Sequence, residues 1–319
     1  MKFLYILVSE EKDIYYEQTL ASALSLRHYN PDAFVTLLVD DRTDKNLVGF
    51  RGEIKNLVNE YKVVPFDESM NNMLRSRMLK TNMRALVEGD FLFIDGDTAV
   101  VAPLEIPDDW PDVAAVADLH AKGNDKYHVK HKKLNRNIAK MQFSQSFENV
   151  YFNSGVVFFR DNPVARAFGE EWHRLYLQGA ENGIFTDQLS FNETNHRLGF
   201  PLAELDGEWN CQVREAYNHL YRVKTIYPIL CRARIIHFFS TGIDGKKEPH
   251  PLMRKDFFEG IKSQGALNDG DRKIIINARN GFFGAPETYD AQVRFPMFFI
   301  YRQWPNLCRF LVRLKEKLK

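Results

Sequence analysis

The chain has 319 residues, of which 45% are hydrophobic, and a formal net charge of +1. Its length allows one large α/β domain with additions or two small domains, and its apolar content is ample for a packed core. The nearly neutral charge excludes a general affinity for nucleic acid. The three cysteines are widely spread and form neither a disulfide framework nor a zinc-binding pattern, which suits a reducing cytosol.

The amino-terminal part of the sequence predicts the start of a doubly wound α/β sheet. Residues 2–8 form an apolar run typical of a buried strand, residues 14–29 have helical periodicity, and residues 34–39 form a second strand. The loop after the first strand lacks the Gly-x-Gly-x-x-Gly signature of dinucleotide-binding folds. The first apolar run is too short for a signal peptide, and no run reaches the length of a membrane span, so we expect a cytoplasmic protein.

The central strand is expected within residues 91–101, after two predicted helices at residues 44–61 and 69–87 and a short strand at 62–65. Its sequence, FLFIDGDTAVV, places two aspartates at the carboxyl end of a buried parallel strand. Open α/β sheets bind ligands at that end of their strands, and two carboxylates there suit Mg²⁺ or Mn²⁺. Alternatively, the Asp-Gly pair is an ordinary turn that ends the strand.

A strongly basic segment follows the next expected strand, which covers residues 112–117 and ends at Asp118. Residues 120–147 contain seven lysines and arginines but a single acidic residue. This pattern is typical of a solvated loop or surface helix. It is equally compatible with a flap that closes over an anionic ligand and excludes water from it.

Polar residues interrupt an apolar strand at residues 150–160. Asn153, Ser154 and Gly155 lie in its middle. A glycine inside a strand indicates close approach of a ligand or of another backbone segment, or else a bulge. Asn153 and Ser154 need hydrogen-bonding partners if they are buried.

Two later signals also have a structural and a functional interpretation. Asp187 and Gln188 follow Thr186 and precede a predicted helix at residues 189–196, so the triplet could simply cap that helix. His237 lies inside the apolar strand predicted for residues 235–239, where it is either a core histidine or a metal ligand.

The last segment, residues 294–319, is basic and aromatic. Aromatic residues precede Pro305, and Leu307, Phe310 and Leu314 follow it at helical spacing among basic residues. This pattern predicts an amphipathic helix that lies on an anionic membrane surface, or a terminal helix docked on the protein.

In chain order, the Asp-x-Asp strand end, the Asn-Ser-Gly-Val strand, the Asp-Gln pair and the late strand histidine resemble the retaining glycosyltransferases of family 8. This family includes glycogenin and bacterial lipopolysaccharide galactosyl- and glucosyltransferases. The resemblance covers about residues 1–239 and implies the GT-A fold, a Rossmann-like, mixed but mostly parallel sheet flanked by helices. It implies a catalytic domain at residues 1–245, a helical extension at 246–319, a UDP-sugar donor and Mn²⁺ or Mg²⁺ as cofactor.

The resemblance also implies roles for individual residues. Asp95 and Asp97 match the metal-binding pair, and His237 matches the third ligand. Asp187 and Gln188 match the pair beneath the anomeric carbon. The implied donor-binding residues are Val8, Ser9, Tyr15 or Tyr16, Lys80, Asp95, Asp118, Asn153 and Ser154.

Two departures from the family pattern are visible. The Gly and Lys-Pro-Trp residues that often follow the metal histidine do not follow His237, so no lysine is assigned to the diphosphate. Gly96 stands where alanine is commoner between the two aspartates, and we expect this change to be harmless sterically.

The expected activity is transfer of a hexose from a UDP-sugar to a glycan or glycolipid, with retention, in bacterial surface polysaccharide synthesis. The alternative is a catalytically inactive sugar-nucleotide- or glycan-binding relative. A nucleotidyltransferase is disfavoured because the loop at residues 8–13 is mostly acidic and has no glycine. Bacterial members of the family use lipid-carried acceptors at the inner leaflet, so the basic tail could hold the enzyme peripherally on that face of the cytoplasmic membrane.

Overall fold

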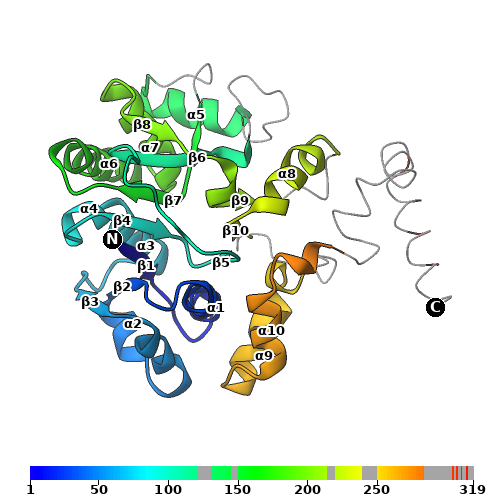
Figure 1. Cartoon of the computed structure of the whole chain (residues 1–319). Helices are drawn as coiled ribbons and strands as arrows, with labels where there is room; N and C mark the ends of the chain where they lie inside the picture. The colour runs from blue at the N-terminus through cyan, green and yellow to red at the C-terminus, as the bar shows by residue number, and fades with distance from the viewer. Residues whose placement is uncertain are drawn as a thin grey trace.

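The computed structural model describes residues 1–120, 131–144, 150–213, 220–238 and 250–283, together with positions 304, 307, 310 and 314. In this part of the chain, helices cover both faces of a central sheet (Figure 1). The α/β architecture predicted from the sequence is confirmed.

The central sheet has seven strands in the order β3-β2-β1-β4-β7-β6-β8. Their bounds are β1 Lys2–Leu7, β2 Phe34–Asp40, β3 Glu60–Val64, β4 Phe91–Ile94, β6 Val113–Ala117, β7 Phe152–Phe159 and β8 Leu202–Glu204. Strand β7 is antiparallel to both of its neighbours, β4 and β6, whereas the other strand pairs are parallel. The strand that carries Asp95 therefore lies in the middle of the sheet.

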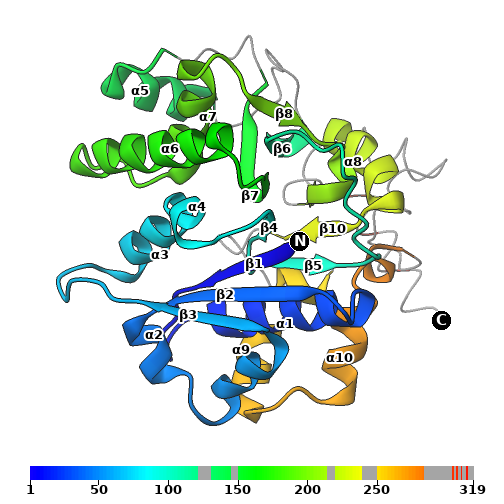
Figure 2. The same ribbon diagram turned by 60° about the vertical axis from the view of Figure 1, so that its left-hand side comes forward.

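Side chains of the sheet alternate between two hydrophobic clusters. On one face, Tyr5 and Leu92 pack with helices α1, α9 and α10, and on the other, Leu4 and Phe93 pack with helices α4, α6 and α7. Figure 2 shows these two helical layers on either side of the strands. The helices are α1 Tyr15–Tyr29, α2 Asp41–Asn46, α3 Asn72–Thr81, α4 Met83–Leu86, α5 His131–Met141, α6 Pro163–Glu181, α7 Asp187–Arg197, α8 Leu220–Arg232, α9 Lys255–Gln264 and α10 Asp269–Ile276.

A second, three-stranded sheet, with the order β5-β10-β9, brings distant residues to the end of β4. Strand β5 (Thr98–Val100) is antiparallel to β10 (Ile235–His237), and β9 (Cys211–Gln212) is parallel to β10. The register sets His237 opposite Thr98 and beside Gln212. The histidine predicted from its apolar strand is thereby placed next to the Asp-Gly-Asp turn.

Two predicted helices are interrupted. The helix expected at residues 44–61 consists of α2 and a separate 3₁₀ helix, Gly49–Leu57, because Gly49 adopts a left-handed backbone with φ of 55°. The short strand after it begins earlier than expected, as β3. The helix expected at residues 69–87 is divided into α3 and α4 at Asn82, whose backbone leaves the helical region at φ −97° and ψ 5°.

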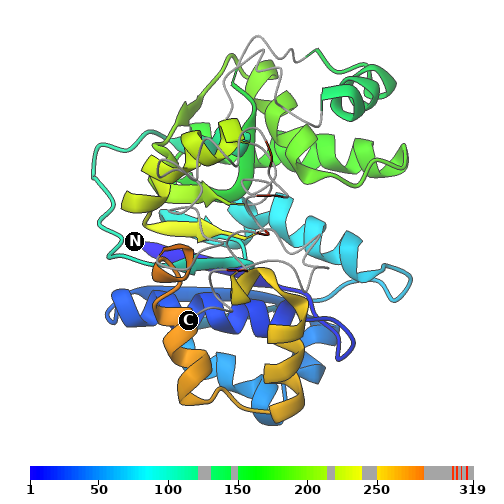
Figure 3. The same ribbon diagram turned by 90° about the vertical axis from the view of Figure 1, so that its right-hand side faces the viewer.

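Residues 250–283 pack on the amino-terminal part of the chain. Phe258 and Ile261 of α9 and Ile275 of α10 join the cluster that contains α1, and Figure 3 shows both helices beside α1. Among the described residues, no helix combines the length and apolar character required to cross a bilayer.

Two sequence predictions fall partly or mostly outside the described residues, namely the basic segment and the tail helix. Of the basic segment, α5 is described, and its Leu134 and Met141 pack in a third hydrophobic cluster. Residues 121–130 and 145–149 lie outside the description, as does residue 239 of the predicted late strand. Of the predicted tail helix, only four single positions are described.

Candidate functional site

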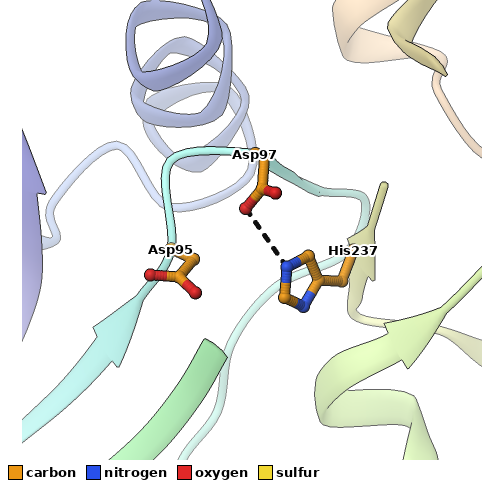
Figure 4. Close-up of side chains that lie close together, drawn as sticks. All are labelled: Asp95, Asp97 and His237. Atoms are coloured by element: carbon orange, nitrogen blue, oxygen red, sulfur yellow. Dashed lines mark hydrogen bonds and ion pairs between the residues drawn. The ribbon is translucent and has the colours of Figure 1, made fainter. Parts of the chain in front are cut away.

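Three side chains able to ligate a metal ion converge at the carboxyl end of β4 (Figure 4). Asp95 follows β4, Asp97 precedes β5, and His237 ends β10, so each comes from a different point of the two sheets. Their ligand atoms lie within 4.8 Å of one another, and His237 Nε2 is 3.1 Å from Asp97 Oδ1. Two carboxylates this close repel each other unless a cation intervenes, and oxygen with imidazole nitrogen suits a divalent ion. These three residues, the carboxylate–histidine group, therefore fit a metal ion chemically.

Gly96 fixes the turn between the two aspartates. A Cβ atom at this position would lie 2.3 Å from Thr19 Oγ1 and 3.2 Å from Thr19 Cβ, because the turn packs directly on helix α1. The prediction that glycine is sterically harmless at this position agrees with the packing, which leaves too little space for an alanine Cβ unless Thr19 moves. The close packing on α1 holds Asp95 and Asp97 on either side of a turn that has no room for a side chain.

His237 is held from both sides. Its Nδ1 is 3.0 Å from Asn210 Oδ1, and its ring lies over Gly155, where an added Cβ would be 2.3 Å from His237 Cε1. Only 4% of the His237 side chain is exposed. The group that lies close to this glycine is the imidazole, a side chain rather than a ligand or another backbone segment. The alternative interpretation, a bulge, agrees with the pairing of β6 with β7, whose register shifts between Ala115 and Ala117 opposite the stretch that contains Gly155.

A second set of charged groups, Lys80, Asp187 and Arg77, adjoins the first. Lys80 Nζ is 2.9 Å from Asp95 Oδ2 and 3.3 Å from Asp187 Oδ2, and Arg77 Nε is 3.1 Å from Asp187 Oδ1. Ser154 Oγ donates a hydrogen bond of 2.8 Å to Asp187 Oδ2. We call these ion pairs the ion-pair network. They connect helix α3, strand β4 and the first turn of α7.

Asp187 does not serve as a helix cap. It is the first residue of α7, and Thr186 at the N-cap position makes no side-chain capping hydrogen bond. Burial favours protonated Asp187, but Arg77, Lys80 and the Ser154 hydrogen bond outweigh it and hold the pKa of Asp187 well below its ordinary value. For Asp95 the balance is reversed, because burial outweighs the opposing charge of Lys80 and raises the pKa of its carboxyl group.

Asp118 and Asn153 are in direct contact. Asn153 Nδ2 donates to Asp118 Oδ1 at 3.0 Å and approaches Gln188 Oε1 at 3.5 Å. The residues after Asp118, Leu119 and His120, both have φ of 54°, which is unusual for residues other than glycine. Such a backbone persists where its surroundings determine it.

Gln212 holds the backbone of Leu119 and His120 in this conformation. Its Oε1 accepts a hydrogen bond from the Leu119 N–H at 2.5 Å, its Nε2 donates to Ala117 O at 3.0 Å, and its own backbone N–H donates to His120 Nε2 at 3.0 Å. Strand β9 thus holds the turn that carries Asp118.

The predicted nucleotide loop lies at the end of β1. Val8 is buried, and Ser9 Oγ donates to Asp13 Oδ1 at 2.6 Å and accepts from Arg51 Nη2 at 2.9 Å. The two tyrosines that are alternatives for donor binding differ in exposure. Tyr16 is completely buried and donates its hydroxyl to Phe50 O, whereas Tyr15 is 43% exposed. Of the two, Tyr15 is the one whose ring a ligand can reach.

Sequence reasoning missed Arg77, Asn210 and Gln212. Arg77 precedes Lys80 by three residues, so both lie on one face of a helix, and this spacing was the available signal. Asn210 and Gln212 lie in a short 3₁₀ turn and a two-residue strand without a recognisable motif. Their roles depend on pairing between strands that are far apart in the sequence.

No protein-family model and no curated protein matches the sequence. Among solved structures, the apo form of mouse xyloside xylosyltransferase 1 is similar at 12% identity and a TM-score of 0.46, over 74% of this chain and 96% of that one. The galactosyltransferase LgtC in complex with donor and acceptor sugar analogues is similar at 13% identity and a TM-score of 0.49, over 86% of this chain and 100% of that one. The glycosyltransferase GlyE of Streptococcus pneumoniae TIGR4 is similar at 15% identity and a TM-score of 0.49, over 87% of this chain and 63% of that one. At this level, the similarity assigns the chain neither a family nor an activity.

Proposed function

We propose that this chain is a metal-dependent glycosyltransferase that moves a hexose from a UDP-sugar to a glycan or glycolipid, with retention at the anomeric carbon. The observation that carries the proposal is the contact between the carboxylate–histidine group and the ion-pair network. Lys80 connects the two, since its Nζ lies 2.9 Å from Asp95 and 3.3 Å from Asp187. A group that can bind a cation and a positively charged side chain therefore lie at one strand end. Both would stabilise the negative charge of a diphosphate that is released from a sugar.

Asp95, Asp97 and His237 would hold Mn²⁺ or Mg²⁺. When bound, the ion supplies Lewis-acid stabilisation of the negative charge that develops on the leaving UDP. Lys80 would add a fixed positive charge beside the same position. Its ion pairs with Asp95 and Asp187 keep the ammonium group at this strand end, and a bound diphosphate would become a further partner.

The sugar would lie between Asp118 and α7. Asp118 and Asn153 offer a carboxylate and an amide to sugar hydroxyls, and Gln188 faces them from the start of α7. Both oxygens of Asp187 are engaged, by Arg77 on one side and by Lys80 and Ser154 on the other. We therefore propose that Asp187 fixes the cations and that Gln188 is the residue nearer to the anomeric carbon.

Hydrolysis of a panel of UDP-sugars by the purified protein tests this function. We expect release of UDP from one UDP-hexose in the presence of Mn²⁺, no release in excess chelator, and a product with the anomeric configuration of the donor. Binding of UDP-sugars in calorimetry without any release of UDP would instead indicate a catalytically inactive relative.

We also propose that the basic tail brings the site to an acceptor carried on a lipid in bacterial surface polysaccharide synthesis. The four described tail positions are apolar and exposed: Trp304 by 57%, Leu307 by 44%, Phe310 by 59% and Leu314 by 45%. Basic residues alternate with them in the sequence, as in segments that bind anionic lipid. Deletion of residues 306–319 should abolish co-sedimentation with anionic liposomes. Equal sedimentation of both proteins would exclude this role.

A further inference from the structure

We infer that Asn210 is a positioning residue that sets the tautomer of His237 and directs its Nε2 toward the metal position. This inference rests on the proposed metal-dependent function but adds a residue to it. Asn210 lies at the end of the 3₁₀ turn Gly207–Asn210 and is completely buried, as a link between β7 and β10. It belongs to an unbroken series of hydrogen bonds, Asp118–Asn153–Asn210–His237, which we call the amide chain.

The direction of the amide chain is fixed by a group that can only donate. The backbone N–H of Gly155 lies 2.8 Å from Asn153 Oδ1. If the Asn153 amide were turned over, two N–H donors would face each other at this distance, which is unfavourable. The carboxylate of Asp118 provides a second anchor, since it accepts from Asn153 Nδ2 at 3.0 Å. Asn153 therefore has one orientation.

The orientation of Asn153 determines that of the next residues in the amide chain. Asn153 Oδ1 can only accept, so the atom of Asn210 that lies 2.9 Å away has to be its Nδ2. The oxygen of Asn210 consequently faces His237 Nδ1 at 3.0 Å, and Nδ1 has to carry a proton. In a neutral imidazole, the other nitrogen, Nε2, is then the one with the lone pair.

This tautomer prepares His237 as a ligand. Nε2 points at Asp97 Oδ1, 3.1 Å away, as the dashed line in Figure 4 shows. A lone pair facing a carboxylate oxygen is favourable only when a proton or a metal ion lies between them. A second hydrogen bond that holds the other ring nitrogen is typical of metal-binding histidines, and it sets both the tautomer and the ring orientation.

The surroundings of the amide chain leave it no alternative arrangement. Asn153, Asn210 and His237 are at most 3% exposed. The His237 ring lies directly over the Cα of Gly155, so it cannot rotate toward β7. The two asparagines therefore act through the geometry of their neutral amide groups.

Replacement of Asn210 by leucine tests the inference. Asn210→Leu should weaken Mn²⁺ binding, measured by calorimetry without donor, by about 10- to 100-fold, the effect typical of losing a partner of a metal ligand. The matched control is Asn195→Leu, because Asn195 is also a buried asparagine but accepts from the Leu202 N–H. We expect the control to lower the melting temperature and leave Mn²⁺ affinity within about twofold of the wild type. Equal affinity of Asn210→Leu and the wild type would overturn the inference.

The tautomer can be read directly in the unmodified protein, so a variant that fails to fold does not prevent the test. We expect the ¹⁵N shifts of His237 in metal-free protein, at a pH where the imidazole is neutral, to show a protonated Nδ1 and an unprotonated Nε2. A signal from the opposite tautomer would overturn the inference even if the protein binds Mn²⁺. Conversely, a wild type that shows the expected tautomer but binds no metal would contradict the proposed function and support the role of Asn210 in fixing the ring.

Discussion

On one side of the candidate site, at β4, α3 and α7, side chains are held by ion pairs, whereas at β7, β9 and β10 they are held by neutral amides. The ion-pair network connects charged groups that each shift the pKa of their neighbours. The amide chain contains two asparagines, whose side chains do not titrate, and its direction is set by a backbone N–H. The two sides can therefore respond differently to pH, to metal and to substitution.

This difference suggests a division of labour. Ion pairs exchange partners when a new charge arrives, so the network is the side that can adapt to a bound cation or diphosphate. Amide hydrogen bonds have fixed donors and acceptors, so the opposite side supplies orientation. His237 lies at the junction, with Nδ1 on the amide chain and Nε2 on the carboxylate.

The largest effect on activity is expected from the loss of Asp97, a proposed metal ligand next to the ion-pair network. Asp97→Ala should lower donor hydrolysis by at least about a thousand-fold, because the ion stabilises the leaving group by several kcal/mol. Stability without metal should change little, since loss of the contact with His237 Nε2 is offset by removal of a carboxylate that repels Asp95. Rates of UDP release and melting temperatures measure the two effects, and Asp109→Ala, at an exposed acidic residue, is the control. Metal dependence would be contradicted if Asp97→Ala were as active as the wild type, or if the wild type kept its full activity in excess chelator.

Substitution of Lys80, the cation that Asp95 and Asp187 share, should show how much the ion-pair network contributes to stability. Lys80→Met leaves the buried Asp187 and the partly exposed Asp95 short of a partner and should lower the free energy of unfolding without metal by about 3–5 kcal/mol. Added Mn²⁺ should restore part of it, because the ion can take over the pairing with Asp95. Urea unfolding with and without Mn²⁺ measures both quantities.

The matched control is Lys62→Met. Lys62 forms a 3.1 Å ion pair with Glu60 at the surface, and its loss should cost less than about 1 kcal/mol, with no effect of Mn²⁺. A similar loss in both variants would show that burial of the Lys80 pairs adds nothing.

The neutral side is disturbed most directly at Gly155. Gly155→Ala places a methyl group where the His237 ring lies and should cost about 1–3 kcal/mol in stability through overpacking. It should also weaken Mn²⁺ binding by about 10-fold or more, as should His237→Ala, if the imidazole is a ligand held by its surroundings. Calorimetry and thermal melting distinguish this from a core histidine, whose loss would lower only the melting temperature.

The same substitution at another glycine provides the comparison. Gly260 lies in α9, and the nearest atom to an added Cβ is 4.0 Å away, so Gly260→Ala should leave Mn²⁺ binding unchanged and stability equal or higher. Unchanged metal affinity in Gly155→Ala as well would contradict the assignment of His237.

The part of this site that depends on strand ends could be predicted from the sequence. Asp95, Asp97 and His237 each stand out against apolar strands, and sheet geometry brings such positions together. Pairing across the chain could not be predicted, because the sequence around Asn210 and Gln212 does not indicate which strand β9 joins. The need for Gly96 was missed for the same reason, since Thr19 touches it from a helix about 75 residues earlier. Local interruptions, such as Asn82 within a predicted helix, were hidden by a continuous apolar periodicity.

The smallest expected effect is a difference in pH dependence between the two sides. The folded-state pKa of Asp187 lies below its ordinary value of about 3.9 in an unfolded chain. Ionised Asp187 therefore contributes stability above that pH, and the contribution is lost as the pH falls toward the folded-state pKa. Asp187→Asn should be less stable than the wild type by about 1.5–3 kcal/mol at pH 6, and the gap should narrow below about pH 4.

Asn210→Leu is the counterpart on the neutral side. It removes one hydrogen bond between two asparagines and one from His237 Nδ1–H, a proton that the ring carries in both its neutral and its cationic form. Its loss of stability should therefore change less between pH 6 and pH 3.5 than that of Asp187→Asn. Urea unfolding of the metal-free proteins at several pH values measures both differences. If the difference in free energy of unfolding between Asp187→Asn and the wild type were constant over this range, the Arg77 and Lys80 ion pairs would not hold Asp187 ionised. If the difference in stability between Asn210→Leu and the wild type narrowed in parallel, the amide chain would depend on the charge of Asp118, the carboxylate that accepts from Asn153. Parallel narrowing would thus remove the distinction between a charged side that adapts and a neutral side that orients.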